Sequence, residues 1–452
     1  MRTAVLLLTY YGCVLYGLFN PAFGILFFIH ITIFRPDALV WGNLAFGRLH
    51  LIASIAALVG YLIQRASLRP TIDDAYQKGN IRIMALFVVW LMFVSLLAEY
   101  SVERSLEKTI EIIKIVIICF LFSKVINERK WIEAYAWVAS MSFGLLSFWG
   151  ALQGMVGNYR LDTLWPGGSN YIAAQLALIA PLALAKAVDS GLRLKWRLMF
   201  GCCTASIVLC CIYTESRGAF VGMAIGLVAL ISQTRQRLKI FAAMVLVMTV
   251  LVPWIPDRYY ERVTTIGAEK EQRDSSAQSR FVLWEIAFRI WHDYPIAGVG
   301  LENFSPVKEQ YAGQVSDIVD SELYALIFNR QRHPHGMYQG MLAEVGAIGV
   351  ALYLWVLVRN ILCPWPRAFA GSERERGLYL QAKGAQAGLI GFAAAAVFGD
   401  FQYLEMVYLQ MMFVGAMRGY ADAVAGVATS PGRDGRVAAV ASEAIRVRLA
   451  GA

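Results

Sequence analysis

Apolar runs close to the length of a membrane-spanning helix dominate this chain. The stretches IMALFVVWLMFVSLLA, LMFGCCTASIVLCCIY and IFAAMVLVMTVLVPWI approach the roughly 20 residues that an α-helix needs to cross ~30 Å of hydrocarbon. Hydrophobic residues make up 58% of the 452 residues and the mean hydropathy is +0.53, whereas a soluble domain is about half apolar. Because apolar and polar residues do not alternate, helices are favoured over a membrane β-barrel. The sequence predicts an all-α, polytopic membrane protein.

The apolar runs predict about twelve transmembrane helices. The first two runs are short and are separated by Pro21, so they form either a tight hairpin or one broken element. The runs lie at 4–19, 20–34, 49–63, 83–101, 110–126, 131–156, 171–188, 198–214, 219–233, 240–256, 337–362, 385–399 and 402–420.

The distribution of Lys and Arg predicts the orientation in the membrane. Basic loops alternate along the chain with loops that carry fewer Lys and Arg, and cytoplasmic loops are enriched in these residues. We therefore interpret the net charge of +9 as a membrane-topology signal and expect no nucleic-acid partner. The basic loops lie at 64–82, 127–131, 192–197, 234–239 and 367–383, and the others at 102–109, 158–170 and 215–218. This pattern predicts transmembrane helices in 1–256, a periplasmic catalytic loop in 257–336, further transmembrane helices in 337–420 and a cytoplasmic tail in 421–452.

One long polar segment, from about residue 257 to 344, interrupts the apolar runs and contains three of the five histidines. Within it, SSAQSRFVLWEIAFRIWHDYP predicts a mostly apolar helix with Ser275 or Ser276 as N-cap and Pro295 at its end. A glycine turn, IAGVGLENF, follows. The stretch 309–333 predicts a short helix on the membrane surface.

Two histidines at the end of this segment are candidate general bases. His335 precedes an apolar helix and lies nine residues before Glu344, and His333 lies just beyond Pro334. An imidazole can accept a proton from a hydroxyl group at physiological pH. The alternative is a structural histidine with satisfied hydrogen bonds. We expect His335 to be the base because it stands at the entry of the helix.

Two arginines on the predicted outer side are candidate phosphate ligands. Arg217, in TESRGAF, lies at the outer end of a predicted span, where a charge is costly unless it has a partner or a task. Arg280 begins the helix RFVLWEIAFRIW, and its guanidinium could grip a phosphate through two hydrogen bonds. The alternatives are a snorkelling Arg217 and a solvated Arg280. Lesser basic residues of the same segment are Lys308, Arg330 and Arg332.

Several motifs that would indicate other chemistry are missing from the sequence. It contains no GxxxxGKS phosphate loop, HExxH, CxxC or DxD, and we interpret Asp73 and Asp74 as a solvated cytoplasmic turn. The scattered acidic residues of the long segment match no known metal loop; they are Asp257, Glu261, Asp274, Glu302, Asp317 and Asp320. We therefore expect a reaction without metal or cofactor. Because the periplasm has no ATP, an activated donor would arrive preformed, on a lipid.

Three motifs in this order resemble the O-antigen ligase/polymerase superfamily. They are SRGAF at the outer end of a span, Arg280 and Trp284 leading into DYPIAGVGLENF, and His335, Tyr338 and Glu344 leading into VGAIG. The resemblance covers about residues 170–349. The N-terminal half resembles, more loosely, the exosortase-associated O-glycosylation ligases. One departure is Gly336, because the family often has Asn or Ser at this position.

The resemblance implies a GT-C-like inner-membrane glycosyltransferase with its active site facing the periplasm. It would transfer a glycan from undecaprenyl diphosphate to lipid A–core by a metal-independent, inverting displacement. Arg217 and Arg280 would bind the diphosphate and His335 would activate the acceptor hydroxyl. The predicted substrate-binding residues are Arg217, Arg280, His333, Tyr338 and Glu344.

Other functions stay open on the sequence alone. A polymerase of the same superfamily would join repeat units on the lipid carrier, and a protein O-oligosaccharyltransferase would glycosylate Ser or Thr. A transporter is disfavoured, because the sequence has no matched pair of Gly/Pro-broken spans and its charges gather at one outer face rather than at the midplane. A scaffold without catalytic activity is disfavoured by the His/Arg constellation.

Overall fold

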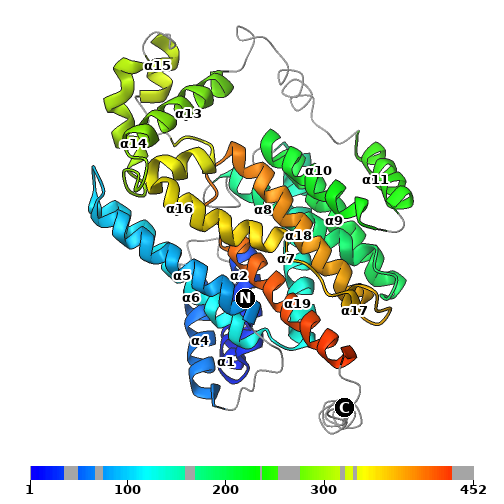
Figure 1. Ribbon diagram of the computed structural model, residues 1–452. Coiled ribbons are helices and arrows are strands. Elements are labelled where there is room, and N and C mark those ends of the chain that lie inside the picture. The colour runs from blue at the N-terminus through cyan, green and yellow to red at the C-terminus, as the bar shows by residue number, and fades with distance from the viewer. Residues whose placement is uncertain are drawn as a thin grey trace.

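The computed structural model describes residues 2–34, 49–66, 75–157, 168–234, 237–252, 275–315, 321–328 and 333–429. In these ranges all regular structure is helical, and every predicted apolar run lies on a helix (Figure 1). The helices are α1 (Arg2–Phe19), α2 (Pro21–Phe34), α4 (Leu49–Gln64), α5 (Ala75–Leu96), α6 (Val102–Val125), α7 (Arg129–Met155), α8 (Ser169–Ala187), α9 (Leu194–Tyr213), α10 (Arg217–Ser232), α11 (Arg237–Leu251), α13 (Ser275–Asp293), α14 (Phe304–Val307), η4 (Lys308–Gln314), α15 (Ser321–Phe328), α16 (Met337–Ile361), α17 (Arg367–Ala370), α18 (Arg376–Ala395), η6 (Ala396–Phe398) and α19 (Glu405–Thr429).

The chain is a multi-pass membrane protein by the length and composition of its helices. Among the described residues, α5, α7, α8, α9 and α16 are each long and apolar enough to cross a membrane, and α1, α2, α4 and α10 are shorter apolar helices. Many large apolar side chains point outward, including Leu8, which is 79% exposed, and Val89, Val228 and Trp355. Lipid tails cover such side chains without cost, whereas water does not. The total of about twelve spans stays a prediction.

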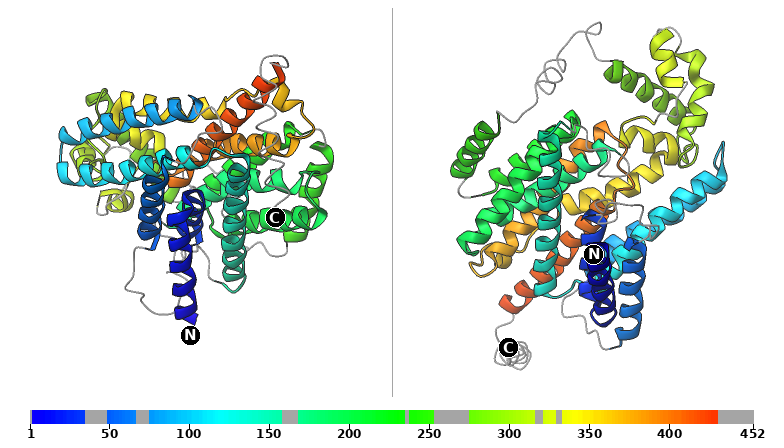
Figure 2. Two further views of the ribbon diagram at one scale, coloured as in Figure 1. Left: turned by 90° about the horizontal axis from the view of Figure 1, so that it is seen from below. Right: turned by 180° about the vertical axis from the view of Figure 1, so that it is seen from behind.

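The helices form three packed groups. Helices α7, α8, α9, α10 and α18 make one bundle, α5, α6, α16 and α19 make a second, and α1, α2 and α4 pack at the side (Figure 2). The packing of the side group shows whether the two runs separated by Pro21 form a hairpin or one broken element. Tyr16 stacks edge-on against Phe23, Tyr10 packs against Phe27, and Gly17 lies against Gly24, so α1 and α2 form a tight antiparallel hairpin.

Helix α18 lies between α8 and α10 because small residues line both contacts. On α10, Gly218, Gly222 and Gly226 recur every fourth residue. Gly222 and Gly226 face α18, where Gly222 meets the backbone of Gly391, and Gly218 faces Phe398 in η6, directly after α18. On its other side, α18 places Gly388 against the backbone of Leu178 in α8. In a membrane, where lipid is as apolar as Leu, such close backbone approach supplies the packing energy between helices.

This contact predicts that Gly222→Leu destabilises the protein. The new side chain would collide with Gly391 O and the Ala395 backbone, so we expect at least ~2 kcal/mol of destabilisation from overpacking. The measurement is a thermal melt of detergent-solubilised protein, followed by size-exclusion profile. Gly201→Leu is the matched control, because the Cβ position of Gly201 in α9 has nothing within 4 Å. Equal melting of both variants and wild type would contradict this packing argument.

The described part of the long polar segment folds into a small domain, which we call the cap (α13, α14, η4 and α15). Its apolar core is separate from that of the bundle and includes Leu283, Ile286, Phe304 and Ile327, and it reaches α16 through Ala343. The Tyr311 hydroxyl in η4 donates a 2.7 Å hydrogen bond to Asp293 Oδ2 at the end of α13, which closes the cap. Figure 1 shows the cap at one end of the molecule, above the start of α16.

The structure confirms the helix predicted before Pro295 and corrects which of its side chains are buried. The cap core takes Val282, Leu283 and Ile286 from α13, whereas Phe281 and Phe288, which the pattern grouped with the apolar residues, are 53% and 43% exposed. Phe281 and Phe288 therefore lie on the outer face of the helix. The predicted start of the tail at Ala421 falls inside α19, where Ala421 is fully buried. Residues 430–452 lie outside the described residues.

Candidate active site

A break in α16 anchors the cap. Gly346 has φ 66° and ψ −174°, which interrupts the helix and releases backbone groups from their usual partners. The turn after α13 supplies new ones: Val299 N donates to Ala343 O (2.9 Å), Gly300 N donates to Glu344 O (2.9 Å), and Pro295 O accepts from Ala347 N (3.0 Å). Two of the three sequence motifs, PIAGVG and EVGAIG, are therefore the two halves of one contact.

Asn303 and Glu344 hold the cap in place. The Asn303 side-chain oxygen accepts from Tyr100 N (3.1 Å) and Ser101 N (2.7 Å), which ties the cap to the connection between α5 and α6. The buried Glu344 side-chain oxygen Oε1 accepts from Phe304 N (3.4 Å). The position of Glu344 favours a role in holding the cap over direct substrate contact. Tyr338 likewise donates to Ala393 O (2.8 Å) and joins α16 to α18.

His335 occupies a strained position at the entrance of α16. Its φ of 52° lies in the left-handed region, as do those of Glu215 (55°) and Glu302 (59°), the other non-glycine residues with positive φ among the described ones. Each such residue costs about 1–3 kcal/mol, and strain of this kind gathers at functional sites. His335 and Glu302 lie beneath the cap, and Glu215 lies two residues before Arg217, in the connection between α9 and α10.

Asp400, from the connection between α18 and α19, holds His335. Its Oδ2 accepts a hydrogen bond from His335 N (3.1 Å) and lies 3.7 Å from His335 Nδ1. Burial raises the pKa of the Asp400 carboxyl, while the nearby His333 and the backbone N–H groups of His335 and Gly336 oppose this rise. Asp400 lies 65 residues from His335 in sequence, and the motif analysis did not single it out.

Gly336 leaves room for polar groups beside His335. A Cβ at this position would collide with the Gln339 side-chain oxygen and lie 2.7 Å from Trp284 Nε1, so an Asn or Ser here would require these side chains to shift. Among the described residues, neither the buried Trp284 Nε1 nor the buried Gln339 Oε1 has a hydrogen-bond partner. Unmet buried groups of this kind are costly and are typical of ligand sites.

The two arginines approach the same end of the bundle. Arg217 begins α10, and the following Gly218 packs against Phe398. The Phe398 ring lies 6.3 Å from the Trp284 ring, and Arg280 precedes Trp284 by one turn of α13, so Arg280 and Trp284 share one face of that helix. Trp284 thus connects the surroundings of Arg217, Arg280 and His335.

The second histidine has a different setting. His333 Nε2 lies 3.8 Å from Glu302 Oε2, and Lys108 Nζ in α6 lies 3.8 Å from Glu302 Oε1. Glu302 therefore links His333 to the α5–α6 end of the bundle. Sequence reasoning considered Glu302 only as a scattered acid, because its partner Lys108 lies far away along the chain.

Of the other residues that the sequence analysis named, one lies in the cap and the rest lie outside the described residues. Lys308 is fully buried within the cap. The described residues contain no cluster of three His, Cys, Asp or Glu side chains arranged for a metal ion. Outside the described residues lie Arg330, Arg332, Asp73, Asp74, Asp257, Glu261, Asp274, Asp317 and Asp320.

The fold and the site define a multi-pass membrane protein in which a cap inserts into a broken helix and gathers two arginines and a histidine at one end. Residues 202–354 match the family model described as O-antigen ligase. This match supports the resemblance to the O-antigen ligase superfamily that the three motifs predicted. Residues 1–183 match a model described as a family of unknown function (DUF5935). No curated protein matches the chain.

Proposed function

We propose that this protein is an O-antigen ligase, which transfers a glycan from undecaprenyl diphosphate to a sugar hydroxyl of lipid A–core. The observation that carries the proposal is the convergence of Arg217, Arg280 and the strained His335 beneath the cap, within the segment that matches the O-antigen ligase family. We place this site at the periplasmic face of a bacterial inner membrane, because the more basic loops belong to the other end of the bundle.

The proposed reaction is a single displacement with inversion. The His335 imidazole accepts the proton of the acceptor hydroxyl, and the hydroxyl oxygen attacks the anomeric carbon. The bond from this carbon to the diphosphate oxygen breaks, and the diphosphate leaves with the bonding electrons. Arg217 and Arg280 stabilise the negative charge that develops on it. The reaction as proposed needs no metal ion.

Three further groups support the chemistry around these residues. Asp400 orients His335 and stabilises its protonated form. The Trp284 N–H and the Gln339 oxygen, which have no hydrogen-bond partner in the described part of the chain, offer a donor and an acceptor to hydroxyl groups of the glycan. The exposed rings of Phe281 and Phe288 on the outer face of α13 offer an apolar surface to the polyprenyl chain of the donor.

The acceptor that receives the glycan distinguishes an O-antigen ligase from a polymerase and from a protein O-oligosaccharyltransferase. Proteoliposomes with undecaprenyl-diphosphate glycan and EDTA would receive lipid A–core, a second lipid-linked repeat unit or an acceptor protein in separate reactions. A ligase extends lipid A–core alone. Longer glycan on the carrier would identify a polymerase, glycosylated protein an O-oligosaccharyltransferase, and no product in any reaction would contradict a transferase. Loss of activity only when EDTA is present would contradict the metal-free mechanism.

Asp400→Asn is expected to slow transfer about tenfold, the effect of losing one charged hydrogen bond. It should also move the acid limb of the pH–rate profile to lower pH by about one unit. The carboxylate lies 3.7 Å from His335 Nδ1 and attracts positive charge there, so its removal favours the neutral imidazole that can act as a base. Removing Asp400 also removes a carboxyl group whose raised pKa adds to the acid limb, in the same direction.

The shift of the acid limb of the pH–rate profile distinguishes an electrostatic role of Asp400 from a purely structural one. A role limited to holding the His335 backbone would lower the rate and leave the limb in place. Asp422→Asn is the matched control, since Asp422 pairs with Arg418 near the C-terminal end of α19, away from the cap. A D400N profile with wild-type rate and wild-type limb would refute the role assigned to Asp400.

A further inference from the structure

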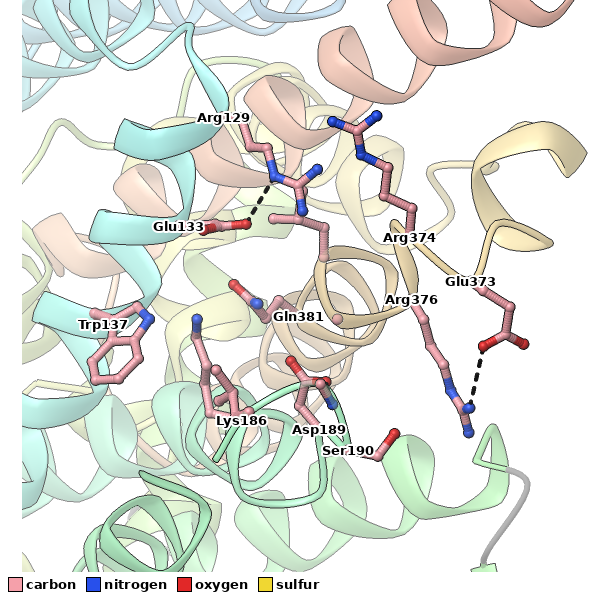
Figure 3. Close-up of a pocket in the computed structure, with 14 residues that line it drawn as sticks. Arg129, Glu133, Trp137, Lys186, Asp189, Ser190, Glu373, Arg374, Arg376 and Gln381 are labelled. Atoms are coloured by element: carbon pink, nitrogen blue, oxygen red, sulfur yellow. Dashed lines mark hydrogen bonds and ion pairs between the residues drawn. The ribbon is translucent and has the colours of Figure 1, made fainter. Parts of the chain in front are cut away.

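A polar pocket of about 340 Å³ lies at the end of the bundle opposite the cap. It is built where α8 ends, α18 begins and α7 begins, and it includes Arg129, Trp137, Lys186, Asp189 and Gln381 (Figure 3). Helix α8 has 19 residues, so its two ends are roughly 28 Å apart, about the thickness of a membrane. The other end of α8 carries Tyr171, which packs against Phe401, next to Asp400. The pocket is thus a separate site.

Lys186 is the buried cation of this pocket. Its side chain is 1% exposed, and its ammonium lies 5.2 Å from the centre of the Trp137 ring. Figure 3 shows the ammonium pointing into the pocket. Within the described residues it makes no hydrogen bond or ion pair, although an ammonium has three donors and its burial without such partners is costly.

The nearby carboxylates already have other partners. Glu133 accepts from Arg129 Nε (3.0 Å), and Asp189 Oδ1 accepts from Gly191 N (2.9 Å). Glu375, beside the pocket, accepts from Arg129 at 2.8 Å. These pairs leave the Lys186 donors available for an anion.

Gln381 adds an unmet acceptor. It is 3% exposed, and its side-chain oxygen has no hydrogen-bond partner among the described residues. The pocket lining mixes both signs of charge, with Arg129, Lys186, Arg374 and Arg376 against Glu133, Asp189 and Glu373. A fitting ligand therefore combines an anionic acceptor group with a donor such as an amine or a hydroxyl.

The surroundings place the pocket at the level of lipid headgroups. Trp137 packs edge-on against Trp196 with the ring centres 5.2 Å apart, and Lys195 lies over Trp196. Trp beside Lys and Arg is typical of the membrane–water interface. The rim is open, because the side chains of Glu373 and Arg374 are 81% and 80% exposed.

We propose that this pocket binds the phosphate-bearing headgroup of a membrane phospholipid. Lys186 binds the phosphate, and Gln381 accepts a hydrogen bond from the amine or hydroxyl of the headgroup. The lipid would fix the ends of α7, α8 and α18 relative to one another at the membrane face opposite the cap. This proposal does not depend on the reaction at His335.

Lipid binding to the delipidated full-length protein tests the proposal. Native mass spectrometry would follow titrations with phosphatidylethanolamine, phosphatidylglycerol and inorganic phosphate. Wild type should retain one phospholipid with saturable affinity. Lys186→Met, which keeps the side-chain length and removes the charge, should weaken this binding about tenfold, the effect of losing one charged hydrogen bond. Lys195→Met is the matched control: it removes a lysine from the same interface that does not line the pocket.

The outcomes are distinct. Unchanged phospholipid binding by Lys186→Met, or an equal loss in Lys195→Met, overturns the proposal. Lys186-dependent binding of inorganic phosphate with no phospholipid retained would overturn the lipid headgroup and assign the pocket to a free anion. If Lys186→Met does not fold, Gln381→Leu takes its place, with an expected weakening of about threefold. Glycan transfer is not measured, so failure here leaves the function proposed for the other site untouched.

Discussion

Replacing His335 with glutamine is expected to reduce glycan transfer by roughly 10²- to 10⁴-fold, the usual effect of losing a general base. Glutamine keeps a polar side chain of similar reach but cannot accept and hold the proton of the acceptor hydroxyl. The strained backbone of His335 and the bond from its N–H to Asp400 stay available in this variant, so folding should be retained. The measurement is initial transfer rate in proteoliposomes at matched protein levels.

Two histidine controls accompany this variant. His333→Gln should retain most activity, since His333 faces Glu302 rather than Asp400. His292→Gln should behave as wild type, because the His292 side chain is 89% exposed at the end of α13. Transfer at the wild-type rate by His335→Gln would eliminate the proposed mechanism. A severe loss in His333→Gln alone would move the role of base to His333.

Arg280→Ala is expected to reduce transfer by roughly 10²- to 10³-fold, as removal of a group that stabilises developing charge does in other enzymes. Arg280→Lys should recover part of this loss, because it keeps the charge but loses the planar pair of donors that fits a phosphate. The measurement is again the initial rate, now with the donor concentration varied. A loss confined to the turnover rate would indicate that Arg280 acts on the leaving diphosphate.

Arg289→Ala is the matched control on the same helix. Arg289 lies nine residues beyond Arg280, pairs with Glu285 at 2.8 Å and is solvent-accessible. Its removal should leave transfer within about twofold of wild type, in line with the small energies of surface ion pairs. Equal losses in Arg280→Ala and Arg289→Ala would show that the cap needs general positive charge, and would contradict a specific phosphate contact by Arg280.

The sequence was informative about the site where the chemistry restricts residue type. Arg217, Arg280 and His335 stand out because an arginine or histidine next to an apolar run is costly without a role. Their motifs also meet in the fold, through Gly218, Phe398 and Trp284. Their roles in catalysis stay predictions. Asp400 did not stand out, because a single acid in FGDFQY has no local pattern that connects it with His335.

The sequence also misjudged some residues within correctly predicted elements. The helix before Pro295 was predicted, but which of its faces is buried was not, since both faces of α13 carry apolar residues. Leu283 and Ile286 are buried in the cap core, whereas Phe281 is exposed. The contact of Glu344 with the Phe304 backbone was likewise invisible, because it joins two segments 40 residues apart.

By itself, the sequence determined that the chain is helical, which segments form its helices and which of its motifs belong to one superfamily. The physical reason is local: hydrocarbon requires apolar runs whose backbone hydrogen bonds close within the segment, and such runs can be read directly. Only the tertiary structure decided how α16 breaks at Gly346 and how the cap satisfies the released backbone groups. It alone placed Asp400 against His335 and Lys186 beside Trp137 in a buried pocket, because those contacts depend on how distant helices pack.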